Sequence, residues 1–144
     1  MQNNNEGLFG LFLKSEDTLW ISSENDVIFQ SRKKGIEPLI DYINQHSPCI
    51  NEVIVCDRVV GNAAALLLKV ACCKMLYASI GSEIAVETLN RLGIPCRFLK
   101  MVPYIINRKG DGMCPFEKAS IGKSPDEFLE YQTKSNSLNS FTPG

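Results

Sequence analysis

Charged and amide side chains interrupt an apolar stretch of the sequence, VIVCDRVVGNAAALLL. Asp57 and Arg58 follow four strand-forming residues, and Gly61 and Asn62 open a run that is typical of a buried helix. Ligands of parallel sheets bind beyond the carboxyl ends of the strands, near helix amino termini. Backbone N–H groups at Gly61 and Asn62 could bind an anion there, although no glycine-rich phosphate motif is present. Asp57 and Arg58 are equally consistent with a structural ion pair or cap and with a polar contact to a ligand.

A second candidate segment, NRKGDGMC, alternates glycines with charged residues. Its Asn107, Arg108 and Asp111 suit either a tight exposed turn or a loop around a ligand. Cys114 is expected at the N-cap of the next helix, and a helix amino terminus favours the thiolate form of a cysteine. Glu117, one turn later, opposes that effect. Cys114 is therefore either a catalytic thiol or a small buried residue of a connecting helix.

The six cysteines and the single histidine form no metal-binding pattern. No C-x-x-C pair occurs, and His46 stands at an expected helix end, where it suits a capping role. Structural zinc usually has four Cys or His ligands in closely spaced pairs. Most of the cysteines lie in or beside apolar runs, so we expect buried, reduced thiols. The sequence predicts neither a metal nor another cofactor.

The elements that must position these residues follow from hydrophobic periodicity and turn residues. A β-hairpin is expected from TLWIS and VIFQS, and Ser82 is the expected N-cap of a later helix. A capping box at Ser124 and Glu127 marks the start of the last helix. Other strands are expected at residues 53–56, 75–79 and 94–102, and helices at 8–13, 36–43, 61–71, 82–92 and from Pro115.

Strand–helix–strand–helix–strand with short links predicts two successive parallel crossover units. With the hairpin added, the sequence predicts an α/β protein with a mixed five-stranded sheet and helices on both faces. Residues 1–134 are expected to form a single domain, and the polar residues 135–144 a flexible tail. In this arrangement Arg58 and Arg108 would make one cleft locally cationic, which suits a phosphate or carboxylate.

Composition narrows the classes of protein. The chain has 144 residues, 44% of them hydrophobic and 22% charged, and a net charge of -1. That balance argues against nucleic-acid binding through general positive charge. No apolar run reaches the roughly 20 residues of a membrane helix, and MQNNNEGLFG lacks the basic leader of a signal peptide. We expect a cytoplasmic protein whose partners are a small-molecule ligand and, in one alternative, further copies of itself.

The segments DRVVGNAAALLL and VPYIINRKGDGMCPFEKA, with a strand ending in YAS between them, resemble a small prokaryotic family, domain of unknown function 1893. The resemblance spans residues 17–120 and implies a cytidine-deaminase-like fold, a three-layer α/β/α sandwich. Active deaminases of that fold hold a catalytic zinc with H-x-E and P-C-x-x-C motifs. By element order these motifs would fall at residues 35–37 and 60–64, where only Glu37 matches in type. The resemblance thus implies the fold without its zinc chemistry, and it supplies no reaction.

Three functions follow from these observations. The first is a zinc-free protein that binds a small polar or anionic ligand, with nucleotide-like molecules included. The second is a cysteine-dependent enzyme or redox protein that uses Cys114. The third is a non-catalytic module that self-associates through a sheet edge or helix surface. We favour the first, with these ligand-binding residues: Asp57, Arg58, Gly61, Asn62, Asn107, Arg108 and Asp111.

Overall fold

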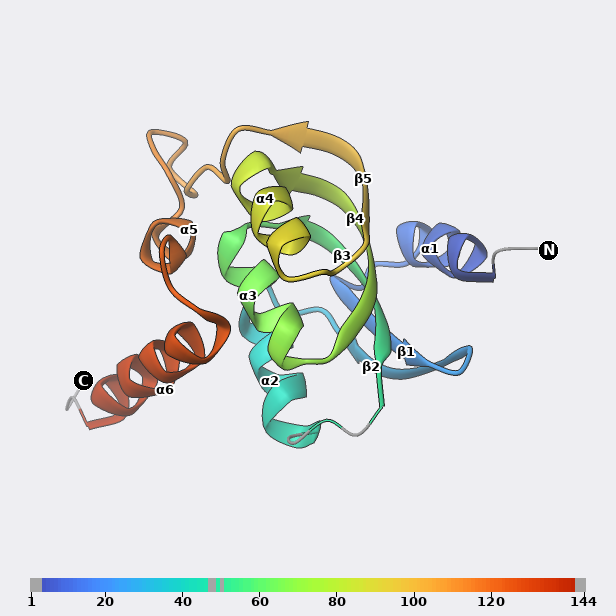
Figure 1. Ribbon diagram of the computed structural model, residues 1–144, viewed down its shortest axis with the longest axis horizontal. Helices are drawn as coiled ribbons and strands as arrows, with labels where there is room; N and C mark the ends of the chain where they lie inside the picture. The colour runs from blue at the N-terminus through green and yellow to red at the C-terminus, as the bar shows by residue number, and fades with distance from the viewer. Residues whose placement is uncertain (1–3, 47–48, 50, 142–144) are drawn as a thin grey trace.

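The computed structural model describes residues 4–46, 49 and 51–141 (Figure 1). Its elements follow the predicted order, with strands and helices alternating after an initial helix and hairpin. The strands are β1 (Leu19–Ser23), β2 (Asp26–Ser31), β3 (Val53–Val60), β4 (Cys73–Ser82) and β5 (Cys96–Val102). The helices are α1 (Asn4–Lys14), α2 (Glu37–His46), α3 (Asn62–Val70), α4 (Glu83–Arg91), α5 (Pro115–Ser120) and α6 (Pro125–Phe141).

One mixed sheet of five strands, in the order β2-β1-β3-β4-β5, organises the molecule. Strand β1 is antiparallel to both β2 and β3, whereas β3, β4 and β5 are parallel to one another. The hairpin and the two parallel crossover units are therefore confirmed. Because β3, β4 and β5 run in one direction, the loops that follow them meet at one edge of the sheet, where ligands of such sheets bind.

Helices flank both faces of the sheet (Figure 1). Helix α1 covers one face, and α2, α3 and α4 cover the other, with α5 and α6 packed outside α3. Successive residues of a strand point to opposite faces. In β3, Val55 accordingly joins the larger core under α2–α4, and Cys56 joins a smaller core under α1 with Phe9, Phe12 and Tyr77. No helix within the described residues is both long and apolar enough to cross a membrane.

Strand β3 continues four residues beyond its expected end at Cys56. Asp57 and Arg58 therefore lie inside the strand rather than in the loop after it. The backbone of Asp57 is registered with Leu19 of β1 and with Ala78 of β4, so the strand is paired on both sides at this point. The apolar run at residues 53–56 covers only the first half of the strand, which is buried. The prediction from this run therefore ended at Cys56.

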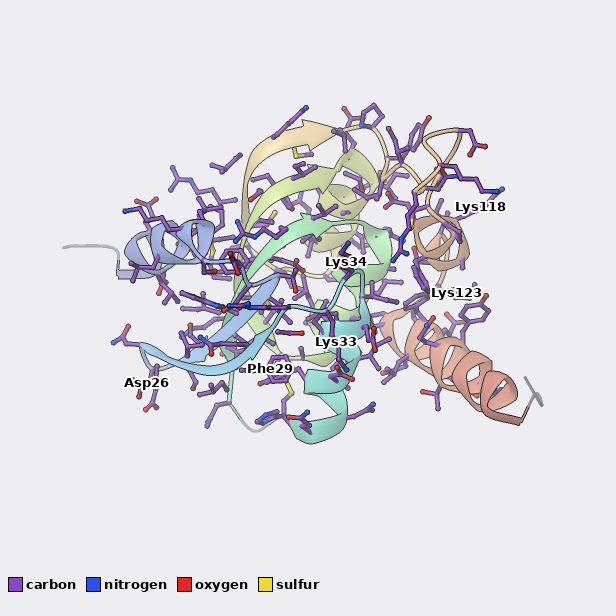
Figure 2. All side chains as sticks on the ribbon, turned by 180° about the vertical axis from the view of Figure 1, so that it is seen from behind. Asp26, Phe29, Lys33, Lys34, Lys118 and Lys123 are labelled. Atoms are coloured by element: carbon purple, nitrogen blue, oxygen red, sulfur yellow. A yellow bond between two sulfur atoms is a disulfide. The ribbon has the colours of Figure 1, made fainter. Side chains whose placement is uncertain are left out.

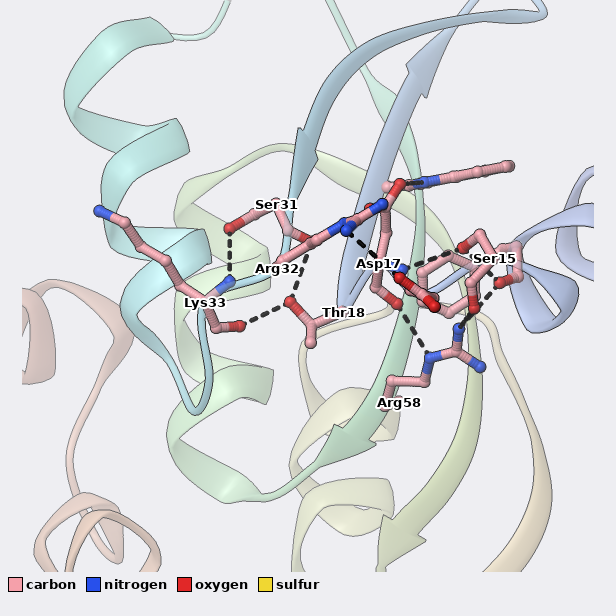
Figure 3. Close-up of polar contacts among 10 residues, drawn as sticks. Ser15, Asp17, Thr18, Ser31, Arg32, Lys33 and Arg58 are labelled. Atoms are coloured by element: carbon pink, nitrogen blue, oxygen red, sulfur yellow. Dashed lines mark hydrogen bonds and ion pairs between the residues drawn. The ribbon is translucent and has the colours of Figure 1, made fainter.

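Arg58 attaches helix α1 to the sheet (Figure 3). Its guanidinium donates hydrogen bonds to the carbonyl oxygens of Phe12 at 2.9 Å and Ser15 at 2.7 Å, and its Nε donates to Asp17 at 3.0 Å. The same group lies 4.3 Å from the centroid of the Phe12 ring. These carbonyls lie at and beyond the end of α1, where a helix leaves acceptors unpaired. Of the two roles left open for Arg58, the structure supports the structural one.

Two of the cysteines expected to be reduced form a disulfide, Cys49–Cys72, with a Cα–Cα distance of 6.3 Å. Cys49 precedes β3 and Cys72 precedes β4. Parallel neighbouring strands start at the same edge of a sheet, and the N–H of Val53 indeed donates to the carbonyl of Cys72 at 3.0 Å. Cys49 and Cys72 are 23 residues apart in the sequence. They meet because β3 and β4 are neighbours in the sheet. The remaining four, Cys56, Cys73, Cys96 and Cys114, are free.

The last helix begins with the predicted capping box. The N–H of Glu127 donates to Oγ of Ser124 at 3.2 Å, and the N–H of Ser124 donates to Glu127 Oε1 at 2.9 Å. Helix α6 then runs to Phe141, so the boundary expected at residue 134 falls within a helix. Residues 142–144 lie outside the described residues, and flexibility of the segment 135–144 stays a prediction.

Candidate functional site

A cavity of about 270 Å³ opens where β3 ends, bounded by the starts of α2 and α3 and by α5. We call it the β3 cavity. Most of its wall is apolar, formed by Ile36, Val59, Ala63, Ala64, Ile105 and Phe116. Its size is at the lower limit for small-molecule sites, which are usually about 300–1,000 Å³. A single-ring compound matches this volume better than a large cofactor.

Asp57 is one of four charged residues in the wall of the β3 cavity, with Lys34, Arg58 and Glu117. Its Oδ1 accepts a hydrogen bond from the N–H of Arg58 at 2.7 Å. Removal from water raises the pKa of the Asp57 carboxyl to about 7, although two backbone hydrogen bonds and the charge of Arg58 act in the opposite direction. At neutral pH this group can therefore accept hydrogen bonds as a carboxylate or donate one as an acid.

The other polar groups that line the cavity come from separate elements. Lys34 precedes α2, and Cys114 precedes α5. Figure 2 shows Lys34 at the start of α2, between the hairpin and the helices α5 and α6. Thr18 also lines the wall, but its hydroxyl already donates towards the carbonyl oxygens of Ser31 at 3.0 Å and Lys33 at 2.5 Å. Lys34 and Cys114 are thus more available to a ligand than Thr18.

A buried carboxylate lies beneath the cavity, at the start of α3. Glu117 is 1% exposed, and its Oε1 accepts from the N–H of Asn62 at 2.6 Å and from Oγ of Ser82 at 3.0 Å. Its Oε2 accepts from the N–H of Ile105. Of the two N–H groups expected to bind an external anion, that of Asn62 is therefore engaged by a carboxylate of the chain itself. The wall of the cavity thus holds two carboxyl groups, Asp57 and Glu117, beside the two cations Lys34 and Arg58.

Close packing at Gly61 holds this arrangement together. A Cβ built at this position would lie 2.9 Å from Cγ1 of Ile105 and 3.0 Å from Oε1 of Glu117. Only a hydrogen atom fits between the start of α3 and the segments around Ile105 and Glu117. Gly61 was predicted to bind a ligand and does line the cavity. In the structure its small size lets Ile105 and Glu117 pack closely against the start of α3.

The seven predicted ligand-binding residues and the candidate catalytic residue Cys114 do not share one cleft. Asp57, Arg58, Gly61 and Cys114 all line the β3 cavity, although the Arg58 guanidinium is engaged at α1. The remaining four occupy other environments, as follows.

Asn62 is buried, where its Nδ2 donates to Oγ of Ser120 at 3.0 Å and its Oδ1 accepts from the hydroxyl of Thr88. Asn107 and Asp111 are hydrogen-bonded to each other at 2.8 Å within an exposed turn. Arg108 lines an adjoining groove. The NRKGDGMC segment is thus mainly a tight exposed turn, one of the two interpretations left open.

Sequence reasoning missed Lys34, Ile36 and Phe116 as parts of the site. The segment SRKKG is typical of a solvated turn, and a single exposed lysine carries no sequence signal of its own. The family resemblance did indicate a location for the cavity, because it places the two deaminase motifs at residues 35–37 and 60–64. Gly35, Ile36, Gly61, Ala63 and Ala64, which fall in those two segments, all line the β3 cavity.

The free thiols are expected to differ in reactivity. Burial raises the pKa of Cys56 and Cys73 to about 12, and it also raises the pKa of the half-buried Cys96. Brief alkylation at pH 8 without reductant should therefore modify Cys114 first, and mass-spectrometric peptide mapping would measure the order. Cys49 and Cys72 should react only after reduction. Faster modification of Cys96 than of Cys114 would contradict this order.

The described residues contain no group of three or more His, Cys, Asp or Glu side chains placed to hold a metal ion. At the segments 35–37 and 60–64 the chain has Gly-Ile-Glu and Val-Gly-Asn-Ala-Ala, which offer one carboxylate and neither imidazole nor thiolate. Catalytic zinc needs three protein ligands beside its bound water. The donor set of this chain does not fit the zinc of a deaminase.

Two comparisons with known proteins gave matches. The model of a family described as "TM1506: Domain of unknown function (DUF1893)" matches residues 10–131. A crystal structure of a DUF1893 family protein (TM1506) from Thermotoga maritima superposes with a TM-score of 0.81 at 24% sequence identity, covering 94% of this chain and 92% of that one. No curated protein matches the chain. The structural match shows a common fold.

Proposed function

The chain belongs to the DUF1893 family, and since that name carries no reaction, we propose a function from the β3 cavity itself. We infer that the protein binds a small nitrogen-containing ring compound, whose N–H or amino group contacts Asp57 and whose ring lies against the apolar wall. The observation that carries this proposal is the Asp57 carboxyl, with a pKa of about 7, in the wall of a mostly apolar cavity at the end of β3.

Removing a carboxylate from water is costly, because the charged form loses its hydration, and at Asp57 this cost outweighs the two backbone hydrogen bonds that the carboxyl accepts. Arg58 provides no side-chain hydrogen bond to Asp57, since its guanidinium is directed to the carbonyls at the end of α1. A ligand with an N–H donor would add a charge-assisted partner to those backbone hydrogen bonds, and perturbed carboxyl groups in cavities are frequent at functional sites. This argument favours a hydrogen-bond donor or cation at Asp57 over the phosphate or carboxylate expected from the sequence.

The location of the cavity supports a cytidine-deaminase-like fold as part of this proposal. The resemblance places the deaminase motifs at residues 35–37 and 60–64, and both segments contribute to the β3 cavity. The shared feature is therefore a ring-binding pocket at the starts of two helices. The zinc ligands are absent from this sequence at those positions, so the proposal includes binding and no zinc-dependent deamination.

Purified protein is expected to contain less than 0.1 zinc per chain and to release no ammonia from cytidine or adenosine, since deamination of this type needs a zinc-bound water. Elemental analysis and an ammonia assay would measure both. One tightly held zinc per chain, retained after dialysis against a chelator, would overturn this prediction.

Benzamidine and benzoate form a matched pair that tests whether the β3 cavity prefers a cationic or an anionic ligand. Both are flat rings of similar size, but benzamidine presents two N–H donors and a positive charge, whereas benzoate presents a carboxylate. We expect benzamidine to bind at least 10-fold more tightly than benzoate at pH 7.5 in isothermal titration calorimetry. Replacement Asp57→Asn should weaken benzamidine binding about 10-fold or more, because it removes a charge-assisted pair.

Asp26→Asn is the matched control, because Asp26 is exposed in the hairpin turn (Figure 2). It removes the same charge from the protein and should leave benzamidine affinity unchanged. Equal binding of benzamidine and benzoate, or equal losses in the two variants, would refute the assignment of Asp57. No binding of benzamidine to the wild-type protein would refute the proposed function.

A cysteine-dependent reaction is the second candidate function. It is favoured by one observation: among the free thiols of the described residues, Cys114 alone lines the same cavity as Asp57. Cys114→Ser separates the two candidates. A binding protein keeps its affinity for benzamidine in this variant, whereas a thiol enzyme loses all turnover.

A further inference from the structure

We propose that the outer edge of strand β5 is a self-association surface, at which a second copy of this chain adds its own β5 in the antiparallel direction. The two five-stranded sheets would then form one continuous sheet around a two-fold axis. Strand β4 separates β5 from β3 in the sheet, so this edge lies apart from the β3 cavity. Association here is therefore independent of ligand binding at the cavity.

Within the described residues, strand β5 pairs only with β4, so its outer side carries unpaired backbone groups (Figure 1). The carbonyl of Pro95, just before the strand, accepts a hydrogen bond from the N–H of Leu76 in β4 at 3.0 Å. Backbone groups of successive strand residues point to opposite sides, so those of residues 97, 99 and 101 also face β4. The N–H and C=O groups of residues 96, 98, 100 and 102 consequently face outward.

An antiparallel copy can overlap β5 along its whole length. The strand has seven residues, so full overlap of Cys96–Val102 with itself places Leu99 opposite Leu99 of the copy. In this register Phe98 lies opposite Lys100 of the copy, and both present their backbone groups outward. Such a pair exchanges two hydrogen bonds, and the two-fold axis repeats it. A shift by one residue would place an outward-facing residue opposite an inward-facing one, so full overlap is also the register that the backbone favours.

The exposed side chains of β5 fit the same register. Leu99 and Met101 are 66% and 43% exposed. They lie on the face of the sheet where α1 packs, because Arg97, two residues before Leu99, is registered with Tyr77 of the core under α1. In the dimer the two Leu99 side chains would contact each other, with a Met101 on either side. An exposed apolar edge strand of this kind favours pairing with another chain.

The cations of β5 do not oppose each other in the dimer. Arg97 forms an ion pair with Glu6 of α1 in its own chain, and it would lie opposite Met101 of the copy. Lys100 would lie opposite Phe98, where its aliphatic stem can cover apolar surface while the ammonium group reaches water. Like charges directly opposite each other destabilise a pair of strands, and this register contains no such pair.

The other edge strand, β2, is less suited to pairing. Its register with β1 skips Ile28, which lies between the paired residues Val27 and Phe29. Such a bulge interrupts the row of outward-facing backbone groups and protects an edge from association. The pairing of β5 with β4 shows no register shift. The second copy is therefore expected at β5 and not at β2.

Sedimentation equilibrium over about 5–500 µM protein measures the association. Seven strand residues a side are fewer than the roughly 20–30 of a stable complex, so we expect a dissociation constant of about 10–100 µM. Leu99→Lys should weaken the dimer about 10-fold or more, because it places two ammonium groups opposite each other. Ile28→Lys is the matched control on the β2 edge, where Ile28 is 42% exposed, and it should leave association unchanged.

A cross-linking experiment tests the register. The Cα atoms of a non-hydrogen-bonded antiparallel pair are about 4.5 Å apart, within the roughly 4.4–6.8 Å range of disulfides. Leu99→Cys should therefore form a covalent dimer in oxidised glutathione, which non-reducing electrophoresis detects. Met101→Cys is the control, since its two introduced thiols would be about 13 Å apart along the strand. Both variants also carry Cys114→Ser, so that Cys114 forms no competing disulfide.

The outcomes separate this surface from the ligand site. Wild-type protein that stays monomeric at the highest concentration, or equal effects of Leu99→Lys and Ile28→Lys, would overturn the association at β5. Cross-linking of Met101→Cys as fast as that of Leu99→Cys would refute the register. Leu99→Lys should bind benzamidine like the wild type. Association that persists without benzamidine binding would contradict only the proposed ligand-binding function.

Discussion

Replacement Glu117→Ala is expected to lower the free energy of unfolding by about 3–5 kcal/mol. The Glu117 carboxylate is buried and accepts hydrogen bonds from the N–H of Asn62, Oγ of Ser82 and the N–H of Ile105. Removing it leaves two buried donors and one partly buried donor without this acceptor, and each unsatisfied buried group costs about 1–3 kcal/mol. The effect should be large because α3, α4 and the segment before α5 all depend on this one side chain.

Chemical denaturation monitored by circular dichroism would measure the loss. Glu117→Gln should cost less than the alanine variant, because it keeps one acceptor oxygen while its amide N–H₂ faces a donor. Glu130→Ala is the matched control: Glu130 forms an exposed ion pair with Lys134, and such pairs contribute at most about 1 kcal/mol. A loss below about 1 kcal/mol for Glu117→Ala would contradict the role assigned to this carboxylate.

Replacement Asp57→Asn is expected to stabilise the protein at pH 8 and to change the pH dependence of its stability. Burial raises the pKa of Asp57 from 3.8 to about 7 in the folded chain. The folded state therefore holds a proton that the unfolded state releases between about pH 4 and pH 7. Stability falls as the pH rises through that window, by up to about 1.4 kcal/mol per pH unit. The accumulated cost at pH 8 is roughly 4 kcal/mol, and an asparagine at this position avoids it because it carries no charge.

Unfolding free energies measured at half-unit steps from pH 4 to pH 8 would test this expectation. The difference between Asp57→Asn and wild type isolates one group, because the other carboxyls titrate in both proteins. Asp26→Asn serves again as the exposed control and should follow the wild-type curve. Parallel curves for wild type and Asp57→Asn would show that Asp57 titrates normally.

The same replacement should thus raise stability and weaken ligand binding. A residue with this combination is typical of a functional site, where a group is kept in an unfavourable environment for its interaction with a ligand. A ligand that donates to Asp57 should also stabilise the wild-type protein more than the variant. Glu117 has the opposite signature, because its loss would destabilise the fold directly.

Much of the fold was predictable because its signals are local. Helical periodicity, turn residues and caps identified every helix and strand up to residue 102 in the correct order, and the N-cap at Ser82 and the capping box at Ser124 have the expected hydrogen bonds. Short links between alternating strands and helices leave parallel crossover units as the favoured arrangement. That topology also predicted the carboxyl end of β3 as one place for a site, and the candidate cavity opens there.

The chemistry of the site was decided by contacts between distant segments. Asp57 and Arg58 are neighbours in sequence, but the strand continues through them, and Arg58 contacts carbonyls more than 40 residues away at the end of α1. Glu117 meets Asn62 across 55 residues and fills the anion position that the sequence left vacant.

The chain by itself thus determined the elements, their order and the edge of the sheet at which a site forms, because periodicity and capping act within a few residues. Only the tertiary structure decided which cations are already paired, which carboxylate is buried, and that Cys49 meets Cys72. Those properties depend on solvent exclusion and on partners brought together by strand order. For that reason the sequence indicated one cationic cleft around Arg58 and Arg108, whereas in the folded chain the Arg58 guanidinium is engaged at α1 and Arg108 lines an adjoining groove.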